Sequence, residues 1–546
     1  MIERVISVPA QPFHDQRPGT SGLRKRTAIF SQPHYLELYL QAVIDALGNL
    51  RGKTVVIGGD GRYHNRPAIE TAIRMLSAAE VSRVLVGRDG LMSTPALSLM
   101  VRAKNAYAGL LFTASHNPGG PQGDFGVKLN LGNGAPAPER VTEAIFQHSR
   151  RLTGYRTLDR VAIDLAKPGA QLCFETLVEV VDPVTDYARA MEKLFDFAAL
   201  EKLIGSRDFR FRFDAMNAVT GPYAREIFEN RLRAPVGSVV NAVPLEDFGG
   251  LHPDPGPSYA KDLFAAMAED TGPDFGAASD GDGDRHVVLG RDLAVAPSDS
   301  IAILAANHQA APGYAKRVNG VARSMPTSRA LDAVAKHLGV PCYETPTGWK
   351  YFTSLLDSGR IVLCGEESAG AGSDHAREKD GLWAVLYWLN ILAVRRMSVG
   401  ALVRTHWRAF GRHAFQRLDY VGLEEDGARA MMQDLRARLR DIEGRRVHGL
   451  LIDTADEYSY VDPVDGTTAD RQGIRIVTAD HARIVYRLSG TGTSGETLRI
   501  YVERLVREGD MLDASAGRLV AGLPGAAALL ADIPRYTGRS APDVVS

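Results

Sequence analysis

Four times along the chain, a short apolar run is followed directly by a glycine-rich polar loop. The four segments are 110–120, 275–285, 361–372 and 484–495. A short apolar run bounded by glycine is typical of a buried strand, and the carboxyl ends of strands are where α/β proteins bind ligands. The repetition predicts several domains, each of which contributes one loop to a shared cleft.

The length and the local patterns support this division. A chain of 546 residues is too long for one core, because single cores rarely exceed about 300 residues. Two apolar runs, 54–58 and 83–87, enclose a helical pattern at 68–79, and this βαβ rhythm predicts a mostly parallel sheet covered by helices. Candidate linkers lie near 181–184, before a helical stretch at 187–203, and near 296–298 and 397–400.

Composition excludes several classes of protein. A formal net charge of −1 gives no reason to expect a nucleic-acid or membrane partner. The three cysteines, Cys173, Cys342 and Cys364, are widely spaced, which argues against a disulfide framework and for a reducing compartment. The most apolar stretch, 381–394, is too short to span a bilayer and predicts a buried helix that starts after Asp380. No targeting segment is visible, so we expect a cytoplasmic protein.

The first loop ends the segment GLLFTASHNPGG at 109–120. Asn117, Pro118 and two glycines form strong turn chemistry. Ser115 and His116 are therefore expected on a loop at the end of a strand. By itself, this segment is equally compatible with a tight turn that has no chemical role.

The second loop alternates three aspartates, Asp280, Asp282 and Asp284, with glycine. Three neighbouring carboxylates repel one another, and a hard divalent cation would offset that repulsion. An EF-hand is excluded, because Arg285 and Arg291 stand where that loop needs Gly and Glu. A solvated acidic turn and a phosphatase of the haloacid dehalogenase type, which also places Asp-x-Asp after a strand, remain alternatives.

The third loop offers Glu366, Glu367 and Ser368 between glycines, an arrangement of acceptors and a hydroxyl that suits the hydroxyls of a sugar. Lys379 follows and can serve as a cation or proton carrier. The alternative is that these glutamates are merely solvated.

The fourth loop, 490–495, matches the dinucleotide fingerprint G-x-G-x-x-G, but the alternating pattern at 497–502 predicts a strand where that fingerprint needs a helix. NAD binding is therefore rejected. Hydroxyls and backbone N–H groups here suit one phosphate instead, flanked by Arg487 and Arg499. A cationic Gly/Ser/Thr loop at 17–26 also fits a phosphorylated ligand.

The four loops contain, in this order along the chain, the motifs TASHNPGG (113–120), DGDGDR (280–285), CGEESAG (364–370) and RLSGTG (487–492). With them, the chain resembles the phosphoglucomutases of the α-D-phosphohexomutase superfamily. The segments 20–25, 346–350 and 372–381 resemble the glucose-specific branch in particular, and the match spans 19–501. Glu496, an acid beside the phosphate loop, is the one feature that this resemblance does not explain.

The resemblance implies an α/β fold with four domains around a central cleft: three α/β domains with mixed sheets and a smaller C-terminal α+β domain. We expect the phosphoserine loop in 1–183, the metal-binding loop in 184–298, the sugar-binding loop in 299–402 and the phosphate-binding loop in 403–546.

The implied activity is that of an isomerase, an intramolecular phosphotransferase that interconverts α-D-glucose 1-phosphate and D-glucose 6-phosphate. The resemblance implies Mg²⁺, a phosphoserine, and glucose 1,6-bisphosphate as intermediate or activator. The expected partner is a small sugar phosphate, bound by a monomer or small homo-oligomer. A mutase that accepts mannose phosphates equally well and a catalytically silent relative remain as alternatives, and a plain phosphatase is disfavoured because it needs no second phosphate grip.

The same resemblance assigns roles to individual residues. Ser115 carries the phosphoryl group and completes a metal site made by Asp280, Asp282 and Asp284. His116, Arg24 and Lys379 are candidates for proton transfer and for stabilising transition-state charge. The implied substrate contacts are Thr20, Arg24, Arg285, Thr347, Trp349, Glu366, Ser368 and Lys379. The implied grip on the second phosphate is formed by Arg487, Ser489, Gly490, Thr491, Gly492 and Thr493.

Overall fold

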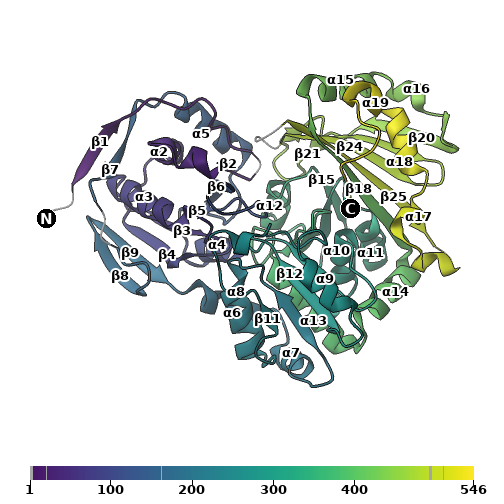
Figure 1. The fold of residues 1–546 in the computed structure, drawn as a ribbon, viewed down its shortest axis with the longest axis horizontal. Coiled ribbons are helices and arrows are strands. Elements are labelled where there is room, and N and C mark those ends of the chain that lie inside the picture. The colour runs from purple at the N-terminus through teal and green to yellow at the C-terminus, as the bar shows by residue number, and fades with distance from the viewer. Residues whose placement is uncertain (1–3, 20, 161–162, 491–494, 508) are drawn as a thin grey trace. The chain divides into compact units, whose positions relative to one another are not determined.

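The computed structural model describes residues 4–19, 21–160, 163–490, 495–507 and 509–546 (Figure 1). Four of the predicted site residues, Thr20, Thr491, Gly492 and Thr493, lie outside this part of the chain. The structure divides into two compact bodies. The first comprises 1–295, 307–317 and 368–400, and the second comprises 296–306, 318–367 and 401–546.

A seven-stranded mixed sheet forms the N-terminal part of the first body. In spatial order its strands are β2 (Leu23–Arg26), β6 (Asp124–Leu131), β5 (Ala108–Phe112), β3 (Thr54–Gly59), β4 (Arg83–Leu91), β9 (Thr176–Val181) and β8 (Gly169–Cys173). The central strands β5, β3, β4 and β9 are parallel, whereas β6, β2 and β8 run antiparallel to their neighbours. The predicted βαβ unit is confirmed, with α3 (Asn65–Ala78) between β3 and β4.

Helices cover both faces of this sheet. Val55 and Ile57 of β3 belong to the same apolar core as α2 (Tyr35–Leu47), α3 and α5 (Glu139–Ser149). Gly109 of β5 faces the opposite way, where a Cβ atom would lie 2.7 Å from Leu97 of α4 (Thr94–Ala103). The alternation of side chains along the strands therefore produces three layers. A short antiparallel pair, β1 (Val5–Pro9) and β7 (Gly154–Leu158), completes this part.

The second sheet of the first body has four strands. They are β11 (Val239–Val240), β10 (Phe211–Asp214), β12 (Phe275–Ser279) and β13 (His286–Leu289), of which only β13 is antiparallel. The accompanying helical elements are α6 (Pro183–Glu192), α7 (Phe197–Ile204), α8 (Thr220–Ala224), the π-helical η1 (Arg225–Arg231), α9 (Lys261–Ala268) and α13 (Gly381–Arg395). The buried helix predicted after Asp380 is α13, and the Asp380 carboxylate caps it by accepting from the Trp383 N–H at 3.0 Å.

The helical stretch predicted over 187–203 is present, but it is divided into two helices, α6 and α7. Asp182 caps α6 by accepting from the N–H groups of Val184 and Thr185, and Pro183 stands at the first helical position, where its missing N–H costs nothing. Asp196 caps α7 in the same way, by accepting from the Ala199 N–H at 3.0 Å. Each helix start thus has its own capping carboxylate.

The second body begins with three parallel strands, β15 (Cys342–Thr345), β14 (Val321–Ser324) and β16 (Leu363–Gly365). Their helices are α10 (Pro297–Ala306), α11 (Ala330–Leu338) and α12 (Lys350–Asp357). No single helix of the described chain is both long and apolar enough to cross a membrane, although α13 and α14 (Val399–Phe410) pass that test as a bent pair.

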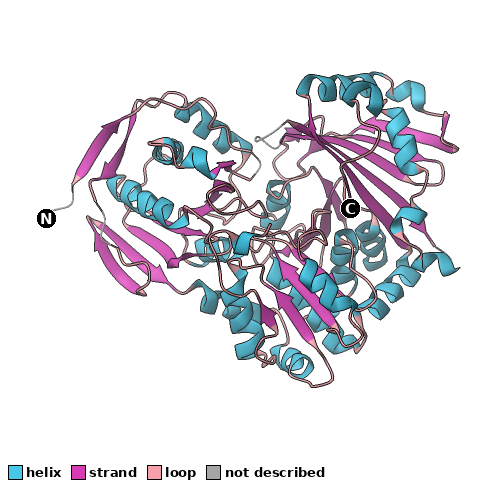
Figure 2. Cartoon of the chain, in the orientation of Figure 1, coloured by secondary structure: helices cyan, strands magenta, loops and turns pink. Residues whose placement is uncertain are grey.

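An antiparallel sheet of seven strands fills the C-terminal part of the second body (Figures 1 and 2). In order, its strands are β19 (Arg446–Val447), β20 (Leu450–Glu457), β23 (Ile474–Thr478), β24 (Arg483–Gly490), β25 (Glu496–Val506), β18 (Arg412–Leu423) and β26 (Val544–Val545). Its helices are α15 (Glu425–Ala437), α16 (Leu439–Ile442), α17 (Ala516–Leu519), α18 (Leu523–Leu530) and α19 (Ile533–Thr537). One face packs on these helices through residues such as Ile484 and Ile500. The strand predicted after the fourth loop is confirmed as β25, so a strand stands where the dinucleotide fingerprint needs a helix.

Candidate active site

The first loop places Ser115 three residues beyond β5 in a left-handed backbone conformation, with φ of 54°. Few residues other than glycine adopt this conformation, so the surroundings must hold it. Ser115 N–H donates to the Thr113 hydroxyl at 2.7 Å, and that hydroxyl donates to Asp60 at 2.6 Å. Thr113, which the sequence places beside the reacting serine, therefore supports the backbone of the loop.

Arg62 is the second support of the Ser115 loop, and it is completely buried. Its guanidinium forms an ion pair with Asp60 at 2.9 Å and donates to the carbonyl oxygens of Ser115 and Asp124 at 2.7 and 2.8 Å. Sequence reasoning missed both Asp60 and Arg62. Their signal was a further glycine-rich loop, Gly59-Asp60-Gly61-Arg62, directly after the apolar strand β3.

The second loop brings three buried carboxylates to Ser115. Asp280 follows β12 directly, and its Oδ2 accepts from the Ser115 hydroxyl at 3.0 Å. Its Oδ1 accepts from the N–H groups of Asp284 and Arg285. Asp280, Asp282 and Asp284 each offer a carboxylate oxygen within 4.8 Å of the others. The predicted juxtaposition of Ser115 and the aspartates is thus present within one body.

The charges of this cluster are unevenly balanced. Burial, reinforced by Asp284 and Asp282, holds the pKa of Asp280 well above its usual range. For Asp282 burial acts in the same direction, but Lys128 and the Thr94 hydroxyl outweigh it and lower the pKa. Among the described residues, the Oδ1 atoms of Asp282 and Asp284 are buried without a hydrogen-bond donor. Three acids with two such oxygens fit a hard divalent cation.

Four cationic side chains face the aspartates. Lys379 lies 3.3 Å from Asp284, and Arg285 lies 3.9 Å from the same carboxylate. Arg24 is in the electrostatic field of Asp282 and Asp284, and its Nε is buried with no hydrogen-bond partner among the described residues. These three residues were predicted, and the structure brings them together with Ser115.

The fourth cation, Lys128, was missed. It lies on the buried strand β6, 3.6 Å from Asp282, 3.8 Å from Glu378 and 3.9 Å from Asp284. Burial would lower its pKa, but Glu378 and the two aspartates outweigh burial and raise it, so the ammonium stays charged. In the sequence, Lys128 could have been found as a lysine within the segment that forms the buried strand Asp124–Leu131.

His116 stands next to Ser115 in the chain, and its Nδ1 lies 3.4 Å from the Ser115 hydroxyl. Its ring stacks on His252 at a centroid distance of 6.1 Å. Burial, followed by the charges of Arg285 and Arg24, holds the pKa of His116 well below its usual range. The imidazole is therefore neutral at pH 7.

The predicted sugar contacts Glu366, Thr347 and Trp349 belong to the second body, whereas Ser368 is the first residue of a segment of the first body. Glu366 follows β16 and is buried. Thr347 Oγ1 and Trp349 Nε1 are buried without hydrogen-bond partners in the described chain. The Trp349 ring packs edge-on against Phe352, so its indole also fills the core.

The fourth loop joins β24 to β25, and the described part of its surroundings is cationic. Arg487 of β24 is directly opposite Arg499 of β25. Like charges at opposed positions repel, so an anion would stabilise this pair. Ser489 and Gly490 follow at the end of β24, opposite Thr497 and Glu496. Glu496, the acid that the resemblance did not explain, has an ion-pair partner in Arg429 of α15. The Arg429 guanidinium lies 3.7 Å from the Glu496 carboxylate.

Family models match almost the entire chain. Phosphoglucomutase/phosphomannomutase α/β/α domains I, II and III match residues 15–156, 185–292 and 297–410, respectively. A model described as the C-terminal domain of phosphoglucomutase-1 matches residues 412–543. The four matches follow one another without overlap and agree with the expected fold class, three α/β domains followed by a smaller C-terminal one.

Relatives of known name match over the full length. A phosphoglucomutase of Rhizobium radiobacter is 51% identical over 542 residues, which cover 99% of this chain and 100% of the relative. The cytoplasmic phosphoglucomutase of Solanum tuberosum is 44% identical, with 100% and 99% covered. The solved structure of the Paramecium exocytosis-sensitive phosphoprotein pp63/parafusin, a phosphoglucomutase in an open form, superposes with a TM-score of 0.91 at 44% identity and covers 100% and 99% of the two chains.

Proposed function

This chain belongs to the phosphoglucomutase/phosphomannomutase family, and we propose that it interconverts α-D-glucose 1-phosphate and D-glucose 6-phosphate through a phosphorylated Ser115. The observation that carries the proposal is the 3.0 Å contact between the Ser115 hydroxyl and Asp280, inside a buried group of three aspartates and four cations. A structural serine has no need of such surroundings. A phosphoryl group needs both parts, an acidic metal site and compensating positive charge.

Asp280, Asp282, Asp284 and an oxygen of the phosphorylated Ser115 would hold Mg²⁺ at this site. The two buried Oδ1 atoms that have no donor in the described chain are the observation that supports this assignment. When bound, such an ion acts as a Lewis acid on the transferring group.

The protein's own groups position the reaction. The bond between the Ser115 oxygen and phosphorus breaks, and a bond forms between phosphorus and the free hydroxyl oxygen of the bound sugar monophosphate, which yields glucose 1,6-bisphosphate. A base takes the proton of that hydroxyl, and the released Ser115 oxygen takes up a proton; His116, whose Nδ1 lies 3.4 Å from the Ser115 oxygen, is the group we assign to both transfers. Lys128, Lys379 and Arg24 neutralise the charge that develops on the phosphoryl oxygens.

The second half of the cycle returns the other phosphate to Ser115, so the bisphosphate turns around between the two transfers. The bisphosphate carries two phosphates, and only one of them reacts in each transfer. Arg487 and Arg499, which are opposite each other on β24 and β25, supply the positive charge that binds the other phosphate. Glu366 and Ser368 are assigned to the sugar hydroxyls. We place the reaction in the cytoplasm, in line with the name of the potato relative.

The test is a coupled assay that measures conversion of glucose 1-phosphate and of mannose 1-phosphate, with and without glucose 1,6-bisphosphate and with EDTA as a control. We expect magnesium-dependent turnover, faster with the bisphosphate, and a preference for the glucose substrate. Absence of turnover by the purified protein in the presence of the bisphosphate and Mg²⁺ would overturn the proposal. Equal turnover of both sugars would retain the mutase but refute glucose specificity.

A further inference from the structure

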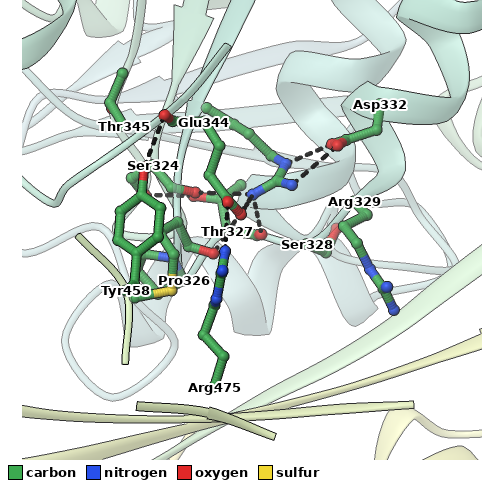
Figure 3. A network of polar contacts seen from close by, with 12 residues as sticks. Ser324, Pro326, Thr327, Ser328, Arg329, Asp332, Glu344, Thr345, Tyr458 and Arg475 are labelled. Carbon is green, nitrogen blue, oxygen red and sulfur yellow. Dashed lines mark hydrogen bonds and ion pairs between the residues drawn. The ribbon is translucent and has the colours of Figure 1, made fainter. Parts of the chain in front are cut away.

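In the second body, a five-residue turn, 324–328, leads from the end of β14 towards α11. The turn has the sequence Ser-Met-Pro-Thr-Ser, and its residues from Ser324 to Ser328 are buried. Figure 3 shows the turn surrounded by Asp332, Glu344, Tyr458 and Arg475. The backbone of a loop rarely lies this deep unless its carbonyl groups find partners.

The carbonyl groups of the turn face Arg323, the residue before it. The Arg323 guanidinium lies within 3.3–3.5 Å of the oxygens of Ser324, Met325 and Thr327. It is itself fixed by a bidentate pair with Asp332 and by Glu344 at 2.9 Å. Glu344 is in turn paired with Arg475 of β23 at 2.6 Å.

A second arginine reaches the same carbonyl groups from the C-terminal sheet. Arg483 of β24 is buried, and it donates to the oxygens of Met325 at 2.8 Å and Thr327 at 2.6 Å. Its charge is paired with Glu503 of β25 at 2.9 Å. Met325 packs against Val485 and Tyr501 of the same two strands, so this contact is also apolar.

The hydroxyl groups of the turn point the other way, to the loop after β16. The Ser324 and Thr327 hydroxyls donate to Oε2 of Glu367 at 2.8 and 3.2 Å. The Glu367 N–H donates to the Thr327 hydroxyl at 2.9 Å. Glu367 is therefore tied by its backbone and by its carboxylate to a turn that Arg483 holds. Glu366, the proposed reader of sugar hydroxyls, is its immediate neighbour.

From this chain of contacts we propose that Arg483 is a positioning residue for sugar recognition. It holds the 324–328 turn in the shape in which Ser324 and Thr327 anchor Glu367, and it thereby fixes Glu366 for the sugar. This inference rests on the proposed function, since it takes Glu366 as a sugar contact. It assigns to the C-terminal sheet a role in selecting the sugar as well as in holding phosphate.

Arg483 lies on the strand that also carries Arg487, four residues further along and on the same face. A change at Arg483 could therefore act through the phosphate grip, and the experiment must separate the two routes. Sugar recognition is measured by the ratio of kcat/KM for glucose 1-phosphate to that for its epimers, mannose and galactose 1-phosphates. The phosphate grip is measured by the inhibition constant of inorganic phosphate.

The experiment compares Arg483→Met with Arg475→Met. Arg475 is the matched control, because it belongs to the same ionic network but donates to no carbonyl group of the turn. We expect Arg483→Met to raise KM for glucose 1-phosphate about tenfold, with a smaller change in kcat, as for a lost ground-state contact. The preference over the epimers should fall severalfold, the inhibition constant of phosphate should stay within twofold, and Arg483→Lys should restore part of the preference. Arg475→Met should retain the wild-type ratio.

The outcomes are decisive in each direction. If Arg483→Met does not fold, the substitute is Thr327→Val, which removes one of the two hydroxyls that donate to Glu367 and should lower the same ratio. An unchanged ratio in the folded variant, an equal fall in Arg475→Met, or a weakened phosphate inhibition of similar size overturns the inference. A wild-type protein that does not turn over glucose 1-phosphate refutes the proposed function instead.

Discussion

The Ser115 hydroxyl donates to the carboxylate of Asp280 at 3.0 Å, although the two residues are 165 positions apart in the chain. The contact joins the loop after β5 to the loop after β12, which belong to different sheets of the first body. A serine that has no histidine–aspartate relay thus lies in the one described cluster of acidic groups with ligand spacing for a metal. The relationship makes Ser115 the first residue to test.

Ser115→Ala should reduce turnover of glucose 1-phosphate by at least about a thousandfold, because it removes the oxygen that we propose carries the phosphoryl group. Thermal unfolding should stay close to wild type, since the lost hydroxyl makes few contacts. The measurement is the coupled assay together with mass spectrometry of the intact protein, which should show one phosphate on the wild type treated with bisphosphate and none on the variant. Ser31→Ala, a change at an exposed serine, is the control. Substantial residual turnover would rule out the phosphoserine route.

Asp282→Asn should weaken magnesium binding and activity together. In the wild type, Mg²⁺ at about a hundred times its Kd should raise the free energy of unfolding by about 2.7 kcal/mol, and this gain should shrink in the variant. Thermal unfolding at increasing Mg²⁺ concentrations measures the effect, with Asp456→Asn, an exposed acid, as control. Full activity of the wild type in EDTA would contradict the metal site.

Asp280→Asn should stabilise the metal-free protein at pH 7 while abolishing turnover. The folded-state pKa of Asp280 is raised, mainly by burial and also by Asp284 and Asp282. A raised pKa contributes stability below the unfolded value of about 4, and that stability is lost as the pH rises through the folded pKa. Near neutral pH the acid therefore costs stability, and the amide removes that cost. Urea unfolding in EDTA at pH 7 should show a higher midpoint for the variant, and a lower midpoint would refute this reading of the charges.

Arg62→Met should destabilise the first body by about 3–5 kcal/mol, because it leaves Asp60 buried without its partner. It also removes the donors that hold the Ser115 carbonyl, so kcat should fall in whatever protein remains folded. Thermal unfolding and the coupled assay give the two readouts. Arg66→Met, which breaks an exposed pair with Glu70, should change stability by less than about 1 kcal/mol. Equal effects of the two changes would contradict the role assigned to Arg62.

His406→Leu should reduce the acid sensitivity of the second body. Burial lowers the pKa of His406 to about 3, and both ring nitrogens are buried without partners in the described structure. A lowered histidine pKa makes stability fall as the pH drops below the unfolded value near 6.5, because only the unfolded state then takes up the proton. At pH 5 the cost is about 2 kcal/mol. Unfolding at pH 7 and pH 5 should show a smaller loss for His406→Leu than for the wild type or for the exposed control His14→Leu, and an identical loss would exclude His406 as the cause.

Much of the architecture follows from local pattern. The apolar runs that became β3, β4, β5 and β12 were visible in the sequence, because a short continuous apolar run bounded by turn residues is a local pattern typical of a buried strand. The boundaries were less well determined. The helical stretch at 187–203 is divided at Asp196, which caps a new helix by accepting from the Ala199 N–H. A carboxylate caps a helix only where the preceding backbone is non-helical, and that conformation is not evident from the sequence.

By itself, the sequence determined the chemical inventory: the candidate phosphoserine Ser115, the three aspartates, the glycine-rich loops and the family to which they belong. Only the tertiary structure decided which of these groups share one buried space, and it added residues that no motif singled out. Asp60 and Arg62 support the Ser115 backbone, Lys128 compensates the aspartates, and Arg483 reaches the 324–328 turn. The physical reason is that a charge acquires such a role through burial and through partners far away in the chain. A buried charge must be paired, and the partner is selected by packing rather than by neighbouring sequence.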